Sequence, residues 1–227
     1  MVTSYRKLSI GLTIAKIIDC YMEDTIKMLI KINQSPYQYG FTALTDFKCC
    51  AVLRDTAVKV GRMKDKTTLI TASDVSNAFS RTTRETQMYE LWRSGERLQV
   101  YMFSRSTYQK TFTVLKNMTS WSPIILEQQG SRQGGKMSAE DYVTYNSSWS
   151  RMIKASKMGL DILGIQIGGF IVADDALGAN SNLAELLAMC FIYEYFSSSH
   201  DVLFAYSKTV LNCFNNPSRT VSNVLHL

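Results

Sequence analysis

The sequence contains few of the residues on which common catalytic and metal sites depend. It has two histidines, His200 and His226, and five cysteines, no two of which form a C-x-x-C pair. A zinc site built from Cys and His ligands is therefore not expected. Neither histidine stands among carboxylates, and Cys49-Cys50 has no histidine nearby, so the usual clusters for acid–base or nucleophilic catalysis are missing. These absences predict a protein that is not an enzyme and that holds no metal or other cofactor.

Long hydrophobic runs and prolines are also scarce. Only 3 of the 227 residues are proline and 46% are hydrophobic, which argues against disorder. The richest apolar stretch, residues 158–196, is interrupted by Asp161, Gln166 and Gly168-Gly169, so it offers no run of the ~20 apolar residues that a membrane-spanning helix needs. We interpret it as the buried centre of a folded domain. The first residues show no compact apolar run followed by a cleavage site, which predicts no secretory signal.

Acidic residues are unevenly distributed, and the middle of the chain is strongly basic. Residues 1–53 carry six Lys/Arg and four Asp/Glu, residues 54–157 carry seventeen and nine, and residues 158–227 carry two and six. The three segments therefore have net charges of +2, +8 and −4. A basic middle beside an acidic last third predicts one surface that faces a polyanion.

Apolar residues recur every three or four positions over 5–32 and 42–60, which predicts two helices. Pro36 and Gly61 follow these segments and mark their ends. Thr71 and Asp74 have the spacing of a helix cap, and the helix they open would carry Arg81 and Arg84 at its far end. A further helix is predicted over 85–104 with a break at Ser94-Gly95, although residues 98–103 fit a strand equally well.

Two short strands are predicted over 111–115 and 123–126, followed by a mobile basic loop with three glycines over 127–136. This loop lacks the residue order of a nucleotide-binding loop. Capping patterns at Ser138 and Asn182 open helices that run to about residue 157 and to the end of the apolar stretch. A last helix is predicted over 201–214. The expected fold is mainly α: a two-lobed helical domain with at most two or three short strands, divided into lobes 1–137 and 138–214 and an arm 215–227.

The basic middle of the chain interleaves cations with aromatic residues, a mixture suited to single-stranded nucleic acid, because cations bind phosphates and rings stack on bases. Tyr108 and Trp121 stand among polar neighbours, which predicts exposed rings. The predicted RNA-binding residues are Arg62, Lys64, Lys66, Arg81, Arg84, Arg105, Tyr108, Lys110, Trp121, Arg132, Lys136 and Lys154. The final residues after Pro217 are unusually apolar for a chain end, which predicts docking on the chain's own domain or on another copy. The predicted oligomerisation residues are Val221, Val224, Leu225 and Leu227.

Two stretches resemble nucleoproteins of segmented negative-strand RNA viruses. Residues 68–79, TLITASDVSNAF, are similar to the Thr/Ser-rich start of a helix in those proteins. Residues 163–169, LGIQIGG, followed by AMCFIY at 188–193, are similar to an apolar segment of the tospovirus members. The resemblance implies a helical two-lobed protein of the virion and host cytoplasm with a basic RNA groove and self-assembly through terminal arms, and a viral polymerase as a further partner. It does not assign the arginines that hold RNA.

Two functions follow as hypotheses. The first is a non-enzymatic nucleoprotein that encapsidates single-stranded RNA and forms homo-oligomers. The alternative is a viral matrix or coat protein whose basic face meets a membrane or a nucleocapsid. RNA binding would protect a fixed number of nucleotides, whereas a matrix protein would prefer anionic lipid.

Overall fold

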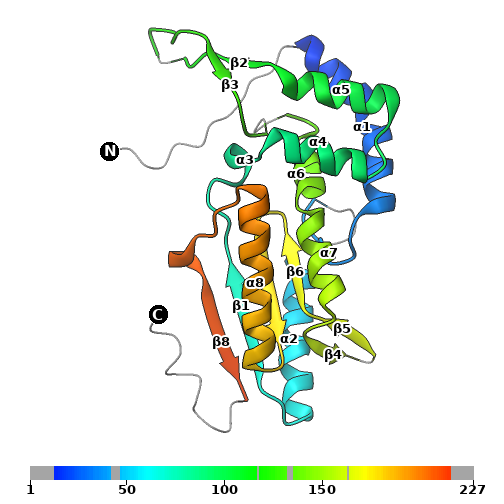
Figure 1. Cartoon of the computed structure of the whole chain (residues 1–227), viewed down its shortest axis with the longest axis vertical. Coiled ribbons are helices and arrows are strands. Elements are labelled where there is room, and N and C mark those ends of the chain that lie inside the picture. The colour runs from blue at the N-terminus through cyan, green and yellow to red at the C-terminus, as the bar shows by residue number, and fades with distance from the viewer. Residues whose placement is uncertain (1–12, 42–46, 117, 132–134, 163, 216–227) are drawn as a thin grey trace. The chain divides into compact units, whose positions relative to one another are not determined.

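The computed structural model describes residues 13–41, 47–116, 118–131, 135–162 and 164–215 (Figure 1). The chain divides into two compact units, each made of two separate segments. Unit 1 comprises Met1–Gln34 and Asn77–Tyr145, and unit 2 comprises Ser35–Ser76 and Asn146–Leu227. The predicted arm beyond Asn215 lies outside the described residues.

Unit 1 is mostly helical. Its elements are α1 (Thr13–Asn33), α3 (Ala78–Arg81), α4 (Arg84–Arg93), α5 (Leu98–Gln109), the short strands β2 (Thr111–Thr113) and β3 (Ile125–Glu127), and α6 (Ser138–Tyr145). The predicted break between α4 and α5 is confirmed, because Gly95 has a φ of 103° that other residues adopt at a cost. Residues 98–103, which fitted helix or strand, lie in α5.

The core of unit 1 forms where α1 and α6 meet. Ile26 on α1 is fully buried against Met137 and Val143, and Met22 and Val100 pack around them. Only part of the predicted apolar stripe of α1 therefore faces a neighbouring helix, because Ile17 and Tyr21 are 64% and 83% exposed. Phe79 and Tyr142 stack with ring centroids 4.6 Å apart, which joins α3 to the same core.

Unit 2 contains a four-stranded antiparallel sheet of order β6-β7-β1-β8. Its strands are β1 (Thr68–Ser73), β6 (Gly169–Val172), β7 (Asp175–Asn180) and β8 (Val210–Phe214). A separate hairpin pairs β4 (Leu160–Ile162) with β5 (Ile165–Ile167). The helices are α2 (Phe47–Met63), α7 (Ser147–Ser156), α8 (Leu183–His200) and the 3₁₀ turn η1 (Tyr206–Lys208).

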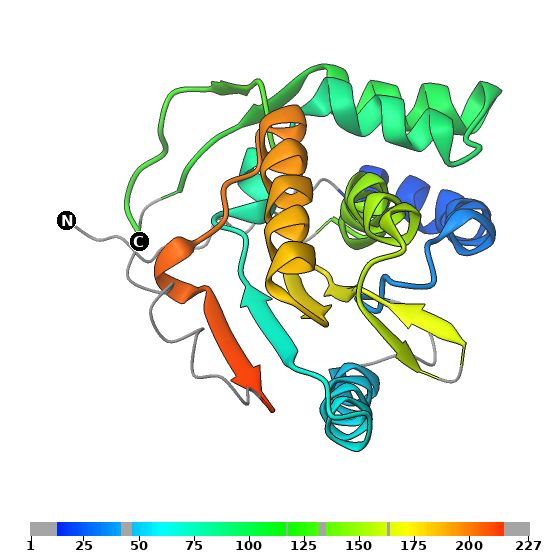
Figure 2. The same cartoon turned by 60° about the horizontal axis from the view of Figure 1, so that its bottom comes forward.

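Helices cover both faces of this sheet. Ala57 on α2 packs against Ile70 and Ala179, whereas the neighbouring residues Thr71 and Gly178 lie toward Tyr193 on α8. Because successive residues of a strand point to opposite faces, α2 and α8 lie on opposite sides of the sheet (Figure 2). None of the described helices is both long and apolar enough to cross a membrane.

The prediction of a mainly α fold is wrong. The described residues form eight strands in three sheets. The largest errors fall at β1, where Thr71 was predicted to open a helix, and at β8, which was predicted to end one. In β1, Thr68–Ser73 pairs with β7 on one side and β8 on the other. Thr71 is therefore a strand residue and not a helix cap, since β-branched residues pack well on a pleated surface once partners exist.

Candidate functional site

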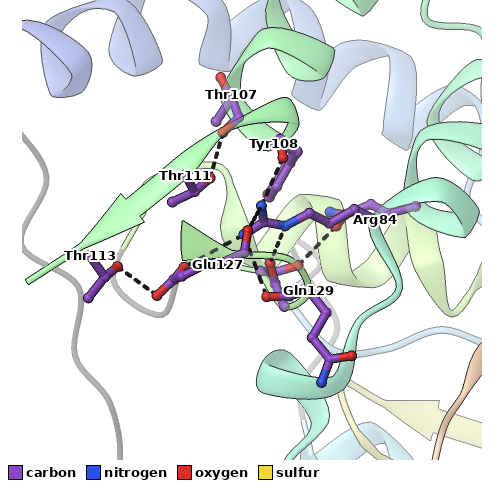
Figure 3. Close-up of polar contacts among 10 residues, drawn as sticks. Arg84, Thr107, Tyr108, Thr111, Thr113, Glu127 and Gln129 are labelled. Carbon is purple, nitrogen blue, oxygen red and sulfur yellow. Dashed lines mark hydrogen bonds and ion pairs between the residues drawn. The ribbon is translucent and has the colours of Figure 1, made fainter. Parts of the chain in front are cut away.

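Arg84, the first residue of α4, ties together three elements of unit 1 (Figure 3). Its guanidinium donates to the backbone carbonyls of Tyr108 at 2.9 Å and Glu127 at 2.5 Å, and it lies 3.6 Å from the Glu127 carboxylate. The Arg84 side chain is 10% exposed. A planar guanidinium has five donors in a fixed fork, so one side chain can fix the end of α5 and the start of the segment after β3.

The same cluster fixes the root of the β2–β3 hairpin. Thr113 donates to the Glu127 carboxylate at 2.6 Å, and Thr111 donates to the carbonyl of Thr107 at 3.2 Å. Phe112 stands directly opposite Leu126 in the antiparallel register. These hydrogen bonds therefore fix the start of the hairpin where it follows α5.

A groove of ≈ 610 Å³ lies between α4, α5 and β3, entirely within unit 1. Its lining combines Tyr101 and Leu126 with the cation Arg105. Arg105 is exposed, and its guanidinium has no hydrogen bond or ion pair with any described residue. The volume is in the range of small-ligand sites, which are typically ~300–1,000 Å³.

The structure distributes the predicted RNA-binding residues over both units. Arg81, Arg84, Arg105, Tyr108, Lys110, Trp121 and Lys136 belong to unit 1, and Arg62, Lys64, Lys66 and Lys154 belong to unit 2. Arg62, Lys64 and Lys66 are all exposed at the end of α2 and beyond it, and the Lys64 ammonium lies 3.4 Å from the Asp161 carboxylate. Lys154 is exposed on α7. Arg132 lies outside the described residues, so its predicted role stays a prediction.

Two of these residues are buried, and their polar groups are engaged by the protein itself. Arg84 is held as described above, and Tyr108 is 4% exposed, with its hydroxyl 2.5 Å from Asp141. The ring of Tyr108 is thus not the exposed ring that its polar neighbours in the sequence predicted. Trp121 is 66% exposed, and Lys136 is exposed with its ammonium 2.6 Å from Glu23.

Sequence reasoning missed a group of carboxylates in unit 2. Strands β6 and β7 are joined by the two-residue turn Ala173-Asp174, and Asp175 begins β7. Because Ser73 pairs with Ala176 in the antiparallel ladder, Asp74 comes next to Asp175 at the same end of the sheet. The proximity of Asp74 could not be predicted while residues 71–74 were interpreted as the start of a helix.

The electrostatics of these carboxylates reflect their crowding. Burial raises the pKa of Asp175, and the neighbouring Asp174 and Asp74 carboxylates raise it further. The ammonium of Lys208, on η1, lies 2.5 Å from Asp74. Carboxylate oxygens are ligands suited to Mg²⁺. As the side chains stand, however, no three His, Cys, Asp or Glu residues in the described ranges are grouped to hold a metal ion.

No known protein-family model matches the sequence, and no curated protein matches it. The fold is similar to solved telomerases at 11–12% identity. Apo telomerase from Candida tropicalis gives a TM-score of 0.65 over 86% of this chain and 36% of its own. Telomerase from Candida albicans in complex with a TWJ fragment of telomeric RNA gives 0.60 over 90% of this chain and 35% of its own. The C. tropicalis telomerase truncated from its C-terminal domain gives 0.62 over 88% and 41%.

These likenesses correct the resemblance to viral nucleoproteins. The stretch TLITASDVSNAF, compared above with a helix start, contains the whole of β1, and LGIQIGG contains β5. β1 belongs to the four-stranded sheet, and β5 pairs with β4 in a separate hairpin. The two stretches therefore form strands and do not support a helical nucleoprotein lobe. The chain spans between about a third and two fifths of the telomerases it matches, and it has the fold of that part of them.

Proposed function

We propose that this chain binds RNA. The observation that carries the proposal is the fold match over 90% of the chain to a telomerase solved in complex with a fragment of telomeric RNA. A second solved complex, the C. tropicalis telomerase with the same kind of RNA fragment, matches over 85% of the chain at a TM-score of 0.63. The net charge of +6 is consistent with a polyanionic partner.

Binding can be measured with a fluorescein-labelled single-stranded RNA of about 20 nucleotides, by anisotropy at several salt concentrations. The logarithm of the affinity should fall linearly with the logarithm of salt, with a slope of roughly −0.7 for each phosphate contacted. Charge reversal of Arg62, Lys64 and Lys66 together tests whether the exposed end of α2 contributes. The absence of salt-sensitive binding by the wild-type chain at low ionic strength would overturn the proposal.

A second candidate function is nucleotidyl transfer on the bound RNA. It is favoured by the register that places Asp74 beside Asp175 and by the position of Asp174 in the adjoining turn. Enzymes that join nucleotides hold Mg²⁺ with one or two carboxylates and the substrate phosphates, and the ion stabilises the charge of the transferring phosphoryl group. Asp74, Asp174 and Asp175 are the side chains that would hold such an ion. A non-enzymatic RNA-binding role, as the sequence predicted, is the alternative.

The carboxylates can be tested without relying on turnover. Mn²⁺ is used as the probe because it is paramagnetic and its binding is measured by electron paramagnetic resonance of the full chain. Asp175→Asn and Asp74→Asn should each weaken Mn²⁺ binding by at least tenfold, whereas Asp55→Asn, at an exposed aspartate of α2, should not change it. Wild-type protein that binds no Mn²⁺ at millimolar concentration, with or without nucleoside triphosphate, would eliminate this candidate and leave RNA binding standing.

A further inference from the structure

The β2–β3 hairpin of unit 1 exposes an unusual number of large apolar side chains. Figure 1 shows β2 and β3 leading away from α5 as a two-stranded ribbon. Its most exposed apolar residues are Phe112, Leu115, Met118, Trp121, Ile124 and Leu126, each at least 50% exposed. Soluble proteins rarely leave large contiguous apolar patches without a partner. These side chains are therefore available to a partner, and their chemistry indicates which kind.

Cations outnumber carboxylates along α5 and the hairpin, although Glu85 and Glu127 also line the groove beside them. From Arg97 to Leu126 the chain carries four cations, Arg97, Arg105, Lys110 and Lys116, and no Asp or Glu. The same thirty residues contain the whole hairpin apart from Glu127, whose carboxylate is engaged by Thr113 and Arg84. From β2 to Leu126 the cations have no carboxylate beside them, so an occupant that matches the charge of the hairpin is an anion. The exposed aromatic rings among these cations suit a partner with flat rings.

The ring nearest the hairpin tip is already placed beside a cation. Lys116 and Trp121 form a cross-strand bridge, and the Lys116 ammonium lies 5.1 Å from the centroid of the Trp121 ring. A base that stacked on the exposed part of this ring would bring its own phosphate close to the same ammonium. Stacking and a phosphate contact would therefore come from one pair of neighbouring residues.

The hairpin continues into the groove between α4, α5 and β3. Leu126 lines that groove, and it lies directly opposite Phe112, so the two side chains share one face of the ribbon. Arg105, whose guanidinium has no partner among the described residues, lines the same groove. The proposed path therefore runs from Arg105 in the groove, along Phe112 and Leu126 on the ribbon, to the Trp121 ring near the hairpin tip.

We propose that this groove and the β2–β3 hairpin form a binding site for single-stranded RNA, in which bases stack on Trp121 and Phe112 and phosphates contact Arg105 and Lys116. The inference rests on the proposed RNA binding and gives it a location in unit 1. The strand is single because stacking on a side chain needs a base that is not already stacked and paired in a duplex. Arg84, which also lines the groove, positions the hairpin through its hydrogen bonds to the carbonyls of Tyr108 and Glu127.

The test compares Trp121→Ala and Phe112→Ala, singly and together, with the conservative Trp121→Phe. The probes are oligouridylate of about 20 nucleotides and a fully paired RNA duplex of equal length. The double variant should bind oligouridylate at least tenfold more weakly, because stacking on one aromatic side chain contributes a factor of roughly 5–150. Trp121→Phe should retain most of the affinity. Arg105→Gln should reduce the slope of the salt dependence by about 0.7.

Tyr21→Ala, at an 83% exposed tyrosine of α1, serves as the matched control and should leave binding unchanged. Circular dichroism melts establish that each variant is folded, and Arg105→Gln gives a second, independent readout should an aromatic variant fail to fold. Unchanged oligouridylate binding by both the double variant and Arg105→Gln overturns this site while the proposed RNA binding stands. A wild-type chain that binds no RNA removes both. Loss of binding to phosphatidylserine vesicles, with RNA binding intact, would identify the hairpin as a lipid contact instead.

Discussion

The hydroxyl of Tyr108 donates a hydrogen bond to Oδ2 of Asp141 over 2.5 Å in the interior of unit 1. Asp141 is 3% exposed, and its Oδ1 has no hydrogen-bond partner among the described residues. Burial raises the pKa of Asp141 to about 8, against a lowering by the Tyr108 hydrogen bond and with a further rise from the Glu96 carboxylate. Burial likewise raises the pKa of Glu96 to about 7. Unit 1 therefore buries two carboxyl groups that hold their protons near neutral pH.

This burial predicts that the protein loses stability as the pH rises. The folded state binds the Asp141 and Glu96 protons more tightly than the unfolded state does. Their contribution to the free energy of unfolding is therefore complete below about pH 4 and is lost as the pH rises through about 7 to 8. Asp141→Asn keeps an acceptor for Tyr108 and cannot ionise. We expect the free energy of unfolding, measured with urea at pH 5.5, 7.0 and 8.5, to fall less steeply with pH in this variant.

The exposed Asp201→Asn is the control and should show the wild-type pH dependence. Glu96→Gln should flatten the profile in the same direction as Asp141→Asn, because Ser104 can donate to an amide oxygen as it does to Oε2 of Glu96 at 2.9 Å. Equal slopes in the wild type and both variants would mean that neither carboxyl changes its proton affinity on folding.

Arg84 should be important for stability although its charge lies away from solvent. Arg84→Lys keeps the charge but loses the fork that reaches the carbonyls of Tyr108 and Glu127. Because each hydrogen bond from a charged donor contributes ~1.5–3 kcal/mol, we expect a loss of roughly 2–4 kcal/mol in the free energy of unfolding.

Arg93→Lys is the matched change at the other end of α4, where the arginine side chain is 51% exposed. It should cost less than about 0.5 kcal/mol. A similar small cost at Arg84 would show that its buried contacts are replaced by water or by neighbouring side chains when the guanidinium is removed.

Local signals in the sequence were sufficient to predict several features of the structure. The break at Ser94-Gly95 and the cap at Asn182 depend on residues within one helical turn, and both are present in the structure. The exposure of Trp121 followed from its polar neighbours. Tyr108 has similar neighbours yet is buried, because it lies on the face of α5 from which its hydroxyl reaches Asp141, 33 positions away.

The sheet could not be predicted in this way, because its partners are distant in the sequence. Leu69 pairs with Asn180 on one side and Cys213 on the other. Residues 210–214 fit a helical pattern as well as a strand, and only the ladder with β1 decides between them. The proximity of the carboxylates at the ends of β1 and β7 depends on that register. The candidate site of unit 2 could therefore not be predicted without predicting the sheet.

The cap of α8 gives a test of a feature that was predicted and found. The Asn182 side chain accepts a hydrogen bond from the backbone N–H of Glu185 at 2.9 Å, and the Glu185 carboxylate accepts one from the N–H of Ser181 at 2.8 Å. Asn182→Ala should lower the free energy of unfolding by about 1 kcal/mol, within a range of roughly 0.5–2. Asn182→Asp, which keeps the acceptor, should stay within about 0.5 kcal/mol of the wild type. Equal losses in both variants would show that the acceptor has no role.

Gly40 packs against the turn that carries Asp174. The Gln38 side chain accepts hydrogen bonds from the backbone N–H groups of both Gly40 and Ala173. A Cβ added at Gly40 would lie 2.1 Å from the backbone nitrogen of Ala173, which is far inside contact distance. Because a backbone atom cannot move aside as a side chain can, Gly40→Ala must displace the turn or its neighbour. We expect a loss of roughly 1–3 kcal/mol in stability and weaker Mn²⁺ binding at the Asp174-Asp175 carboxylates.

Gly164→Ala is the control for this change. No atom lies within 4 Å of a Cβ added there, and its φ of 84° means that the substitution costs only backbone strain, about 1 kcal/mol. It should therefore lower stability without altering Mn²⁺ binding. Mn²⁺ binding by Gly40→Ala equal to that of the wild type would show that the position of this turn does not determine the ion's affinity.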